Sequence, residues 1–146
     1  MQTVMPFRVR FADTDKMGVV YQSNYVTYMH EARDDFFEQV YRAADDIERQ
    51  GVIFPTHALD VVFNESLQYG DDAIILTELE SLTPIRMVFH HRLFLKDADT
   101  ARDNPMTEAH IEVYAARSSD NKPANLKKSI PELYEILKSA AHEEGQ

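Results

Sequence analysis

Two aspartates, Asp13 and Asp15, stand in a short polar turn before the first long helical pattern of the sequence. That helix is expected to begin near Asn24 and to end near Tyr41. The first N–H groups of a helix have no partner inside it, so they can hold a carbonyl oxygen as it becomes negative. A carboxylate beside them can activate water or attack a carbonyl carbon directly. Asp-x-Asp before a helix is often only an Asx-turn or a cap, so the spacing alone leaves catalysis and a structural role both open.

The elements on either side would position these carboxylates. Before the turn, residues 7–11 alternate between apolar and basic side chains and predict a short strand. Gly18 gives the turn a flexible joint. After the turn, apolar side chains recur at three- and four-residue steps and predict one buried helical stripe, formed by Tyr25, Tyr28, Met29, Ala32, Phe36 and Val40. Strand, acidic turn and helix N-terminus are thereby expected to lie together.

The rest of the chain predicts a short helix, four strands and a final helix. The short helix begins at residue 44 and ends at Gly51, which suits a C-terminal cap. Strands are expected at residues 57–67, 73–82, 85–95 and 107–116, with polar loops at 96–106 and 117–126. Ser129 and Glu132 form a capping-box pattern that opens the last helix, with Pro131 in its first turn. A long helix against an antiparallel sheet is the natural layer arrangement, so the fold class is α+β.

Length and composition exclude several classes of protein. The 146 residues amount to one ordinary domain, taken to span residues 1–146. The absence of cysteine excludes disulfides, thiolate metal sites and cysteine nucleophiles, and it fits a cytoplasmic location. The sequence has no apolar run of membrane-spanning length and no signal-sequence pattern, so neither membrane insertion nor export is expected. The net charge of −10 argues against a nucleic-acid partner, because such proteins normally carry a basic surface.

Residues 13–25, which read DTDKMGVVYQSNY, resemble the signature of the 4-hydroxybenzoyl-CoA thioesterase family. The resemblance is nearest to the acyl-CoA thioesterase branch associated with the Tol–Pal system. Weaker likenesses follow in the family's order at residues 69–72, 86–91, 108–113 and 130–131. The resemblance implies a hotdog fold, in which an antiparallel sheet wraps one long central helix and a short helix follows at the C-terminus.

The same resemblance implies roles for the residues around the helix start. Asp15 matches the family's catalytic carboxylate, as general base or nucleophile, and Asp13 then forms the turn. Gln22 matches the residue whose backbone N–H holds the thioester carbonyl, although the nearest branch usually has histidine there. A glutamine side chain cannot act as an acid or a base. Tyr21 and Asn24 flank the site: Tyr21 would line the acyl pocket or pack in the core, and Asn24 would cap the helix.

Coenzyme A is polyanionic, so an acidic protein needs a local basic cluster to bind it. Lys127 and Lys128 precede the last helix, and Arg86 and Arg92 share one face of a predicted strand. We expect these four side chains to bind the CoA phosphates. Ordinary surface charge is the alternative for each of them.

No metal site is expected from the histidines. His90 and His91 are adjacent on a strand, so they point to opposite faces and cannot easily share an ion. The others show no ligand spacing along the chain: His30, His57, His110 and His142.

Two functions follow from these features. The first is an acyl-CoA thioesterase that hydrolyses a thioester with Asp15 and the helix N–H groups, without a metal or redox cofactor. The second, suggested by Gln22, is a non-catalytic acyl-CoA or acyl-carrier binding protein on the same fold. A dehydratase is a weaker third option, because that chemistry usually pairs a histidine with a carboxylate and the helix-start motif holds no histidine. The identity of the acyl group depends on pocket shape.

An oligomer is expected as well. In the resembling family the site lies between two subunits, which implies a homodimer or a tetramer of paired dimers. The sequence adds a reason, because residues 73–76 and 85–95 are apolar on both faces of their strands, with Val88 and Phe94 opposite Met87, Phe89 and Leu93. A monomer is expected to expose those side chains as a patch.

Overall fold

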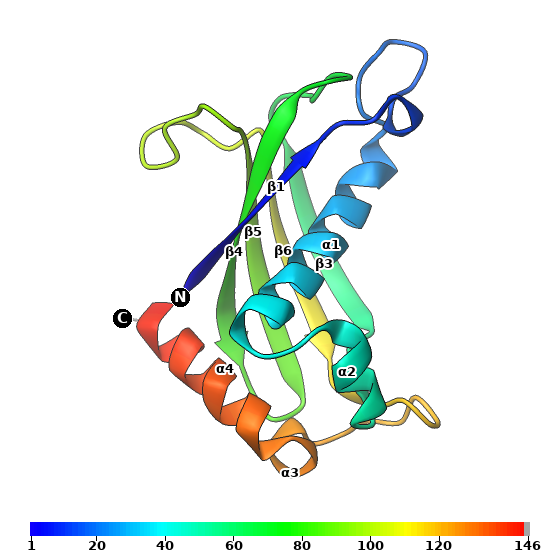
Figure 1. Ribbon diagram of the computed structural model, residues 1–146, viewed down its shortest axis with the longest axis vertical. Helices are drawn as coiled ribbons and strands as arrows, with labels where there is room; N and C mark the ends of the chain where they lie inside the picture. The colour runs from blue at the N-terminus through cyan, green and yellow to red at the C-terminus, as the bar shows by residue number, and fades with distance from the viewer. Residues whose placement is uncertain (145–146) are drawn as a thin grey trace.

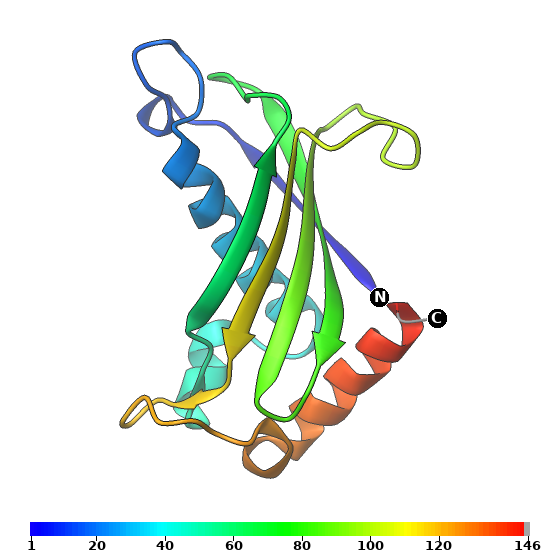
Figure 2. The same ribbon diagram turned by 180° about the vertical axis from the view of Figure 1, so that it is seen from behind.

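The fold is one long helix held in the curve of an antiparallel sheet, as the sequence predicts. A computed structural model describes residues 1–144, with side chains to residue 141. Figures 1 and 2 show α1 (Gln22–Val40) lying along one face of the five-stranded sheet. The strand order is β1-β4-β5-β6-β3, and all neighbours are antiparallel. The strands are β1 (Gln2–Arg8), β3 (Thr56–Phe63), β4 (Asp72–Leu82), β5 (Arg86–Leu95) and β6 (Thr107–Tyr114).

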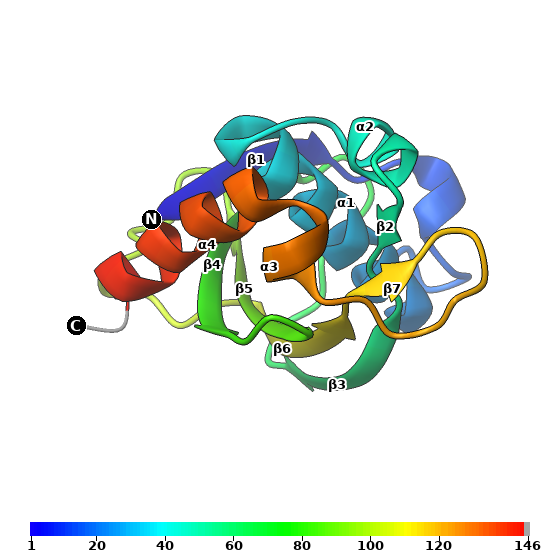
Figure 3. The ribbon, with the colours of Figure 1, turned by 90° about the horizontal axis from the view of Figure 1, so that it is seen from below.

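Smaller elements lie at the lower end of the molecule, and a short turn lies directly before α1. A 3-10 turn, η1 (Phe11–Asp13), precedes α1, and α2 (Ala44–Arg49) follows it. Two short strands, β2 (Val52–Ile53) and β7 (Ala116–Arg117), pair with each other. The chain ends in α3 (Leu126–Ser129) and α4 (Pro131–Glu144), and α4 packs against β4 (Figure 3).

The core lies between α1 and the inner face of the sheet. The predicted helical stripe is buried from Tyr25 to Phe36, and Phe37 joins it at 1% exposure. Phe36 and Phe37 both contact the ring of Phe89 on β5, at centroid distances of 5.4 and 5.7 Å. Each such side chain contributes about 1.5–3 kcal/mol by its removal from water, so this contact holds the helix on the sheet.

One polar cluster is buried in this core. His91 occupies an inward position on β5, and its Nδ1 lies 2.9 Å from the hydroxyl of Thr77. Burial, aided by the positive charge of Arg33 on α1, lowers the pKa of His91 to about 3, so the ring is neutral at physiological pH. Arg33 is itself buried; its guanidinium lies 3.1 Å from Nδ1 of His30, while its Nε has no partner in the described part of the chain.

Several predicted boundaries are wrong, each for a local reason. The first strand covers Gln2–Arg8 and not residues 7–11, because the chain turns at Arg10 to bring Asp13 inward. The loop predicted at 117–126 begins with β7 and ends in α3, whose first turn Asn125 caps by accepting from the N–H of Lys128. The first hydrogen bond of α4 goes to the carbonyl of Ile130, so the predicted capping box at Ser129 is not the helix start.

The expected apolar patch on the sheet is also wrong. Phe94 and Leu76 are 1% and 3% exposed within the single chain, and Val88 is half-buried. Exposed apolar side chains lie instead on the edge strand β3, where Leu59, Val62 and Phe63 are between 47% and 51% exposed. Every residue of β3 except Val61 is exposed, so this edge is open. Long open edges of this kind are sites where another chain can pair.

No helix in residues 1–144 is long and apolar enough to cross a membrane.

Candidate active site

The acidic turn is a closed loop at the N-terminal end of α1 (Figure 1). Thr14 and Val20 form an isolated bridge across its base. Inside the loop, the N–H of Asp15 donates to the carbonyl of Val19 at 2.9 Å, and the N–H of Gly18 donates back to the carbonyl of Asp15 at 3.0 Å. Gly18 has φ +78°, a left-handed conformation that glycine adopts at no steric cost. The loop is therefore a defined structure and not a loose connection.

Asp13 anchors this loop from below. It is 5% exposed, and it accepts hydrogen bonds from the hydroxyl of Tyr28 at 2.9 Å, from Nη2 of Arg10 at 2.9 Å and from the Arg10 N–H at 3.2 Å. Burial raises the pKa of Asp13, but the bonds from Arg10 and Tyr28 outweigh burial and hold that pKa below its usual value. The ionised carboxylate is thus fully engaged, which agrees with a structural role for Asp13.

The helix starts two residues earlier than expected. Gln22 is its first residue and Tyr21 its N-cap, in an extended conformation with φ −66° and ψ 134°. The expectation that Asn24 caps the helix is wrong, because Asn24 already lies in the first turn. Its side-chain Nδ2 donates to the carbonyl of Asp13 at 2.8 Å, and that carbonyl also accepts the N–H of Tyr21 at 2.9 Å. Both bonds fasten the acidic turn to the helix.

Two backbone donors remain at this helix terminus. The N–H of Asn24 donates to the carbonyl of Tyr21, and the N–H groups of Gln22 and Ser23 have no partner within the helix. The helix dipole adds positive potential at these groups. Gln22 is exposed, so an oxygen from outside can reach them. Unpaired donors of this kind are the groups from which an oxyanion site can be built.

Asp15 is exposed at the rim of this terminus. Its Oδ1 accepts the N–H of Met17 at 2.8 Å, which forms an Asx-turn and fixes the direction of the carboxylate. Its second oxygen has no hydrogen bond to the described residues. Asp15 is therefore oriented by the loop yet available for chemistry, whereas Asp13 is not.

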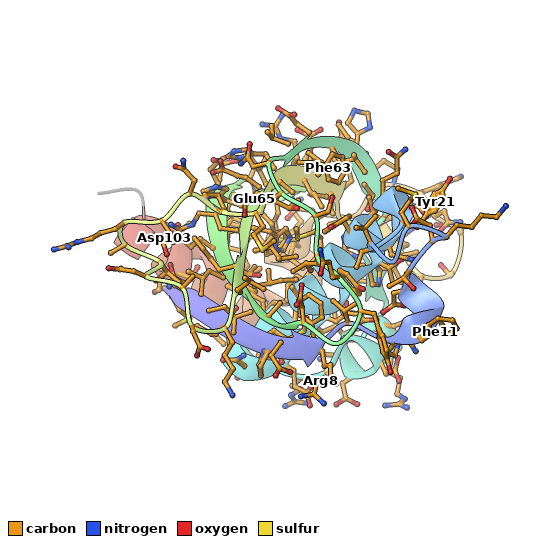
Figure 4. All side chains as sticks on the ribbon, turned by 90° about the horizontal axis from the view of Figure 1, so that it is seen from above. Arg8, Phe11, Tyr21, Phe63, Glu65 and Asp103 are labelled. Atoms are coloured by element: carbon orange, nitrogen blue, oxygen red, sulfur yellow. The ribbon has the colours of Figure 1, made fainter. Side chains whose placement is uncertain are left out.

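Exposed aromatic side chains surround the acidic turn. Tyr21 is 51% exposed, so it is not the packed core tyrosine that was one of the two expectations. The rings of Phe11 and Tyr69 meet edge to face at 5.8 Å and are both largely exposed. Figure 4 shows Phe11, Tyr21 and Phe63 at this end of the molecule. Such a gathering of exposed apolar groups is typical of a binding or subunit surface.

The predicted CoA-binding residues lie far from Asp15 in the single chain. Lys127 and Lys128 are exposed on α3, which Figure 1 places at the opposite end of the sheet from the start of α1. Arg86 begins β5 at that same lower end, where its Nε contacts Glu112 at 3.2 Å. The 19 residues of α1 span about 28 Å between the two ends, at roughly 1.5 Å per residue. One chain therefore does not bring the basic residues to the carboxylate.

Arg10 and Tyr28 were missed as members of the site. Arg10 stands three residues before Asp13, and Tyr28 lies one helical turn after Asn24 on the face that meets the loop. The i,i+3 spacing of a cation and an anion was a usable signal for Arg10. Tyr28 belonged to the apolar stripe, and only its contact in space reveals that its hydroxyl serves Asp13.

Known proteins are similar to this chain along most of its length. Residues 9–130 match the family described as the thioesterase-like superfamily. The putative acyl-CoA thioesterase YneP of Bacillus subtilis is 25% identical over 136 residues, 90% of this chain and 92% of that protein. The acyl-CoA thioester hydrolase YbgC of Escherichia coli is 28% identical over 125 residues, 86% of this chain and 90% of that protein.

A solved structure extends the likeness to three dimensions. The DHNA-CoA thioesterase from Staphylococcus aureus is 27% identical and superposes with a TM-score of 0.89, over 99% of this chain and 95% of that chain. The family resemblance and the hotdog fold expected from the sequence are both confirmed.

The two aspartates should differ sharply in their effect on stability. Asp13→Asn is expected to cost about 1.5–3 kcal/mol, because it weakens charge-assisted hydrogen bonds to a buried group. Asp15→Asn is expected to cost less than about 0.5 kcal/mol, because the residue is exposed and asparagine keeps the Oδ1 acceptor. Urea denaturation at pH 7 measures both.

Lowering the pH should remove the stability difference between wild type and Asp13→Asn. Its folded pKa is lowered, so its stabilising effect is present above the unfolded pKa of about 3.9 and is lost as pH falls through the folded value. The free-energy gap between wild type and Asp13→Asn should therefore narrow below about pH 4. An equal loss of stability in Asp15→Asn would contradict the division of roles.

Proposed function

Since this chain belongs to the thioesterase-like superfamily, we propose that it hydrolyses acyl-CoA thioesters with Asp15 and the first N–H groups of α1. The observation that carries this proposal is the oriented, unengaged carboxylate of Asp15 in the loop that leads into the start of α1, where the N–H groups of Gln22 and Ser23 have no partner within the helix. The relatives named as acyl-CoA thioesterases support the reaction and the substrate class.

The thioester carbonyl oxygen would accept from the N–H groups of Gln22 and Ser23. As general base, Asp15 takes a proton from water, and the hydroxide adds to the carbonyl carbon. The oxyanion then collapses, the C–S bond breaks, and the thiolate recovers the proton from Asp15. As nucleophile, Asp15 attacks the carbon, forms a mixed anhydride and expels the CoA thiolate, and water then hydrolyses the anhydride.

Both routes use water and side chains of this protein alone. The proposed reaction therefore needs no metal or redox cofactor. The side chain of Gln22 can donate a hydrogen bond or position water, but it cannot transfer a proton. We also propose that the protein acts in the cytoplasm, in keeping with a sequence that lacks cysteine.

The acyl group would enter between α1 and the open edge strand β3. Val26 and Met29 follow Gln22 along one face of α1 and line a small cavity together with Leu59 of β3. The volume of this cavity in one chain is about 30 Å³, far below the roughly 300–1,000 Å³ of ligand pockets. A second subunit would supply the missing wall and exclude water from Asp15.

We propose that the second subunit pairs its β3 with this β3. Two identical strands related by a two-fold axis pair antiparallel, so the partner is turned end for end. Its lower end, with Arg86, Lys127 and Lys128, would then lie near Asp15 of the first chain. The exposed Leu59, Val62 and Phe63 on β3 support this interface. Two such dimers would make the tetramer expected from the family resemblance.

Asp15→Asn should abolish thiol release from acyl-CoA esters. Loss of the base or nucleophile is expected to lower the rate by at least about 10²-fold, with the fold unchanged by circular dichroism. Asp97→Asn, in an exposed loop, is the matched control and should be as active as wild type. Tight acyl-CoA binding without thiol release by wild-type protein would favour the non-catalytic binding protein instead.

Gln22→Pro separates the backbone N–H from the side chain. Proline is favoured at the first helical position, and the extended conformation of Tyr21 suits a residue before proline. The variant should keep α1 yet lose one oxyanion donor, with a fall in kcat of roughly 10²–10³-fold. Gln22→Ala keeps the N–H and should lose far less. Equal rates in the two variants would remove Gln22 from the oxyanion site.

Mixing two inactive variants tests the shared site. One variant carries Asp15→Asn and the other carries Lys127→Ala with Lys128→Ala. If each site takes Asp15 from one chain and the lysines from the other, a mixed dimer holds one intact site, and remixing should restore about a quarter of wild-type activity. Light scattering before and after mixing establishes the dimer. A site built within one chain would recover no activity on mixing.

A further inference from the structure

We propose that His90, His110 and Glu108 bind one divalent transition-metal ion on the outer face of the sheet. These residues lie in the middle of β5 and β6, at positions that alternate with the buried, core-facing residues of the two strands. Figure 2 shows the face of the sheet that turns away from α1. The proposed thioesterase reaction uses none of them. The site is therefore distinct from the Asp15 loop, and its His110 pairs with Asp60 of the edge strand β3.

The sheet register makes the two histidines direct partners. His90 on β5 pairs with His110 on β6, and such partners carry Cβ atoms about 4.5–5.5 Å apart. Their rings are stacked, with 4.4 Å between centroids and 4° between planes. Glu108 lies two residues before His110 on the same face, and its Oε2 is 2.5 Å from Nε2 of His90. One possible ligand atom from each of the three side chains lies within 4.8 Å of the other two.

A second carboxylate orients one of these histidines. Oε1 of Glu80, on β4, lies 3.0 Å from Nδ1 of His110. A carboxylate at Nδ1 favours the proton there and leaves a lone pair on Nε2, which is the arrangement behind most metal-binding histidines. Glu80 is the residue left unpaired by the bulge between Leu79 and Ser81. The cluster thus supplies both ligands and a supporting residue.

The ligand types select the class of ion. Two imidazoles and one carboxylate suit zinc and other late first-row divalent ions, whereas calcium and magnesium prefer oxygen ligands throughout. Metal–nitrogen bonds of about 2.0–2.1 Å require the two stacked rings to turn towards each other as the ion binds. All three side chains are half-buried, so they have room to turn and leave a fourth position for water.

The charge around the cluster also favours a cation. Glu108 and Glu80 each face a histidine, so neutral rings would leave two negative charges for an ion to offset. The neighbouring Glu78 is already paired with Arg92 at 3.3 Å. The alternative is a pair of His–Glu hydrogen bonds with no affinity for metal. The two possibilities differ in direct binding, whether or not the protein is active on thioesters.

Distance along the chain hid this site from the sequence. His90 and His110 are twenty positions apart, and only the pairing of β5 with β6 makes them neighbours. His91, which is adjacent to His90 in the sequence, is buried in the core. The side chain of His142 lies outside the described residues. The expectation of no metal site rested on the spacing of histidines along the sequence, whereas the sheet brings residues from two different strands together.

Titration of untagged, chelator-treated protein with zinc tests the proposal. Calorimetry should give one ion per chain, and cobalt(II) in its place should give the visible absorption of a nitrogen-ligated ion. His110→Ala and the isosteric Glu108→Gln should each abolish binding. Glu80→Gln should weaken binding by about 10–100-fold, as loss of a supporting carboxylate does. Circular dichroism without metal checks that each variant folds.

His57→Ala is the matched control. His57 also faces a carboxylate, with its Nε2 3.6 Å from Glu112, and it is outside the proposed ligand set. The control should bind zinc as wild type does. The proposal is overturned if wild-type protein binds neither zinc nor cobalt at millimolar ion, or if His110→Ala binds as tightly as wild type.

Discussion

The hydrogen bonds to the buried carboxylate of Asp13 are the constraint on which the active end of the molecule depends. A carboxylate can be buried only if its oxygens are paired, and the two partners here come from opposite sides of the turn. Arg10 lies on the incoming chain, and Tyr28 is the seventh residue of α1. Satisfying one charge thus fixes where strand, loop and helix meet. That junction also fixes the loop that carries Asp15 at the N-terminal end of α1.

Two aspartates separated by one residue consequently hold different properties. Asp13 is enclosed and engaged, while Asp15 is in water with one oxygen held and the other open. A carboxylate exposed to water is poorly placed for catalysis, because the high dielectric constant of water weakens its interactions with other charges. The exposed aromatic groups around it and the bare edge of β3 are the surfaces that a second subunit would cover. In this thioesterase the proposed second subunit would account for both the incomplete site and the open edge.

The sequence predicted the parts of the fold whose periodicity is uniform. The stripe from Tyr25 to Phe36 identified α1, and alternation placed β4, β5 and β6 within a few residues. It failed where hydrogen bonds in space override local pattern, as when Asn24 donates to Asp13 and does not cap the helix. It also predicted that a single chain would expose Phe94, because alternation cannot show that the same chain buries both faces of a strand.

Site residues divide along the same line. Asp15 and Gln22 were predicted from a continuous motif, whereas the contact of Tyr28 with Asp13 is not indicated by any spacing in the sequence. The basic residues at 86, 127 and 128 are exposed, but their distance from Asp15 is a property of the folded chain. The bulge in β4 has a further consequence for how relatives are compared. Up to Leu79, odd-numbered residues of this strand face α1, and beyond the bulge Leu82 faces inward opposite Met87. A relative without the extra residue keeps the same inward phase only if its alignment carries a one-position gap at residue 80 or 81. An ungapped alignment of β4 would therefore compare core positions with surface positions in the last residues of the strand.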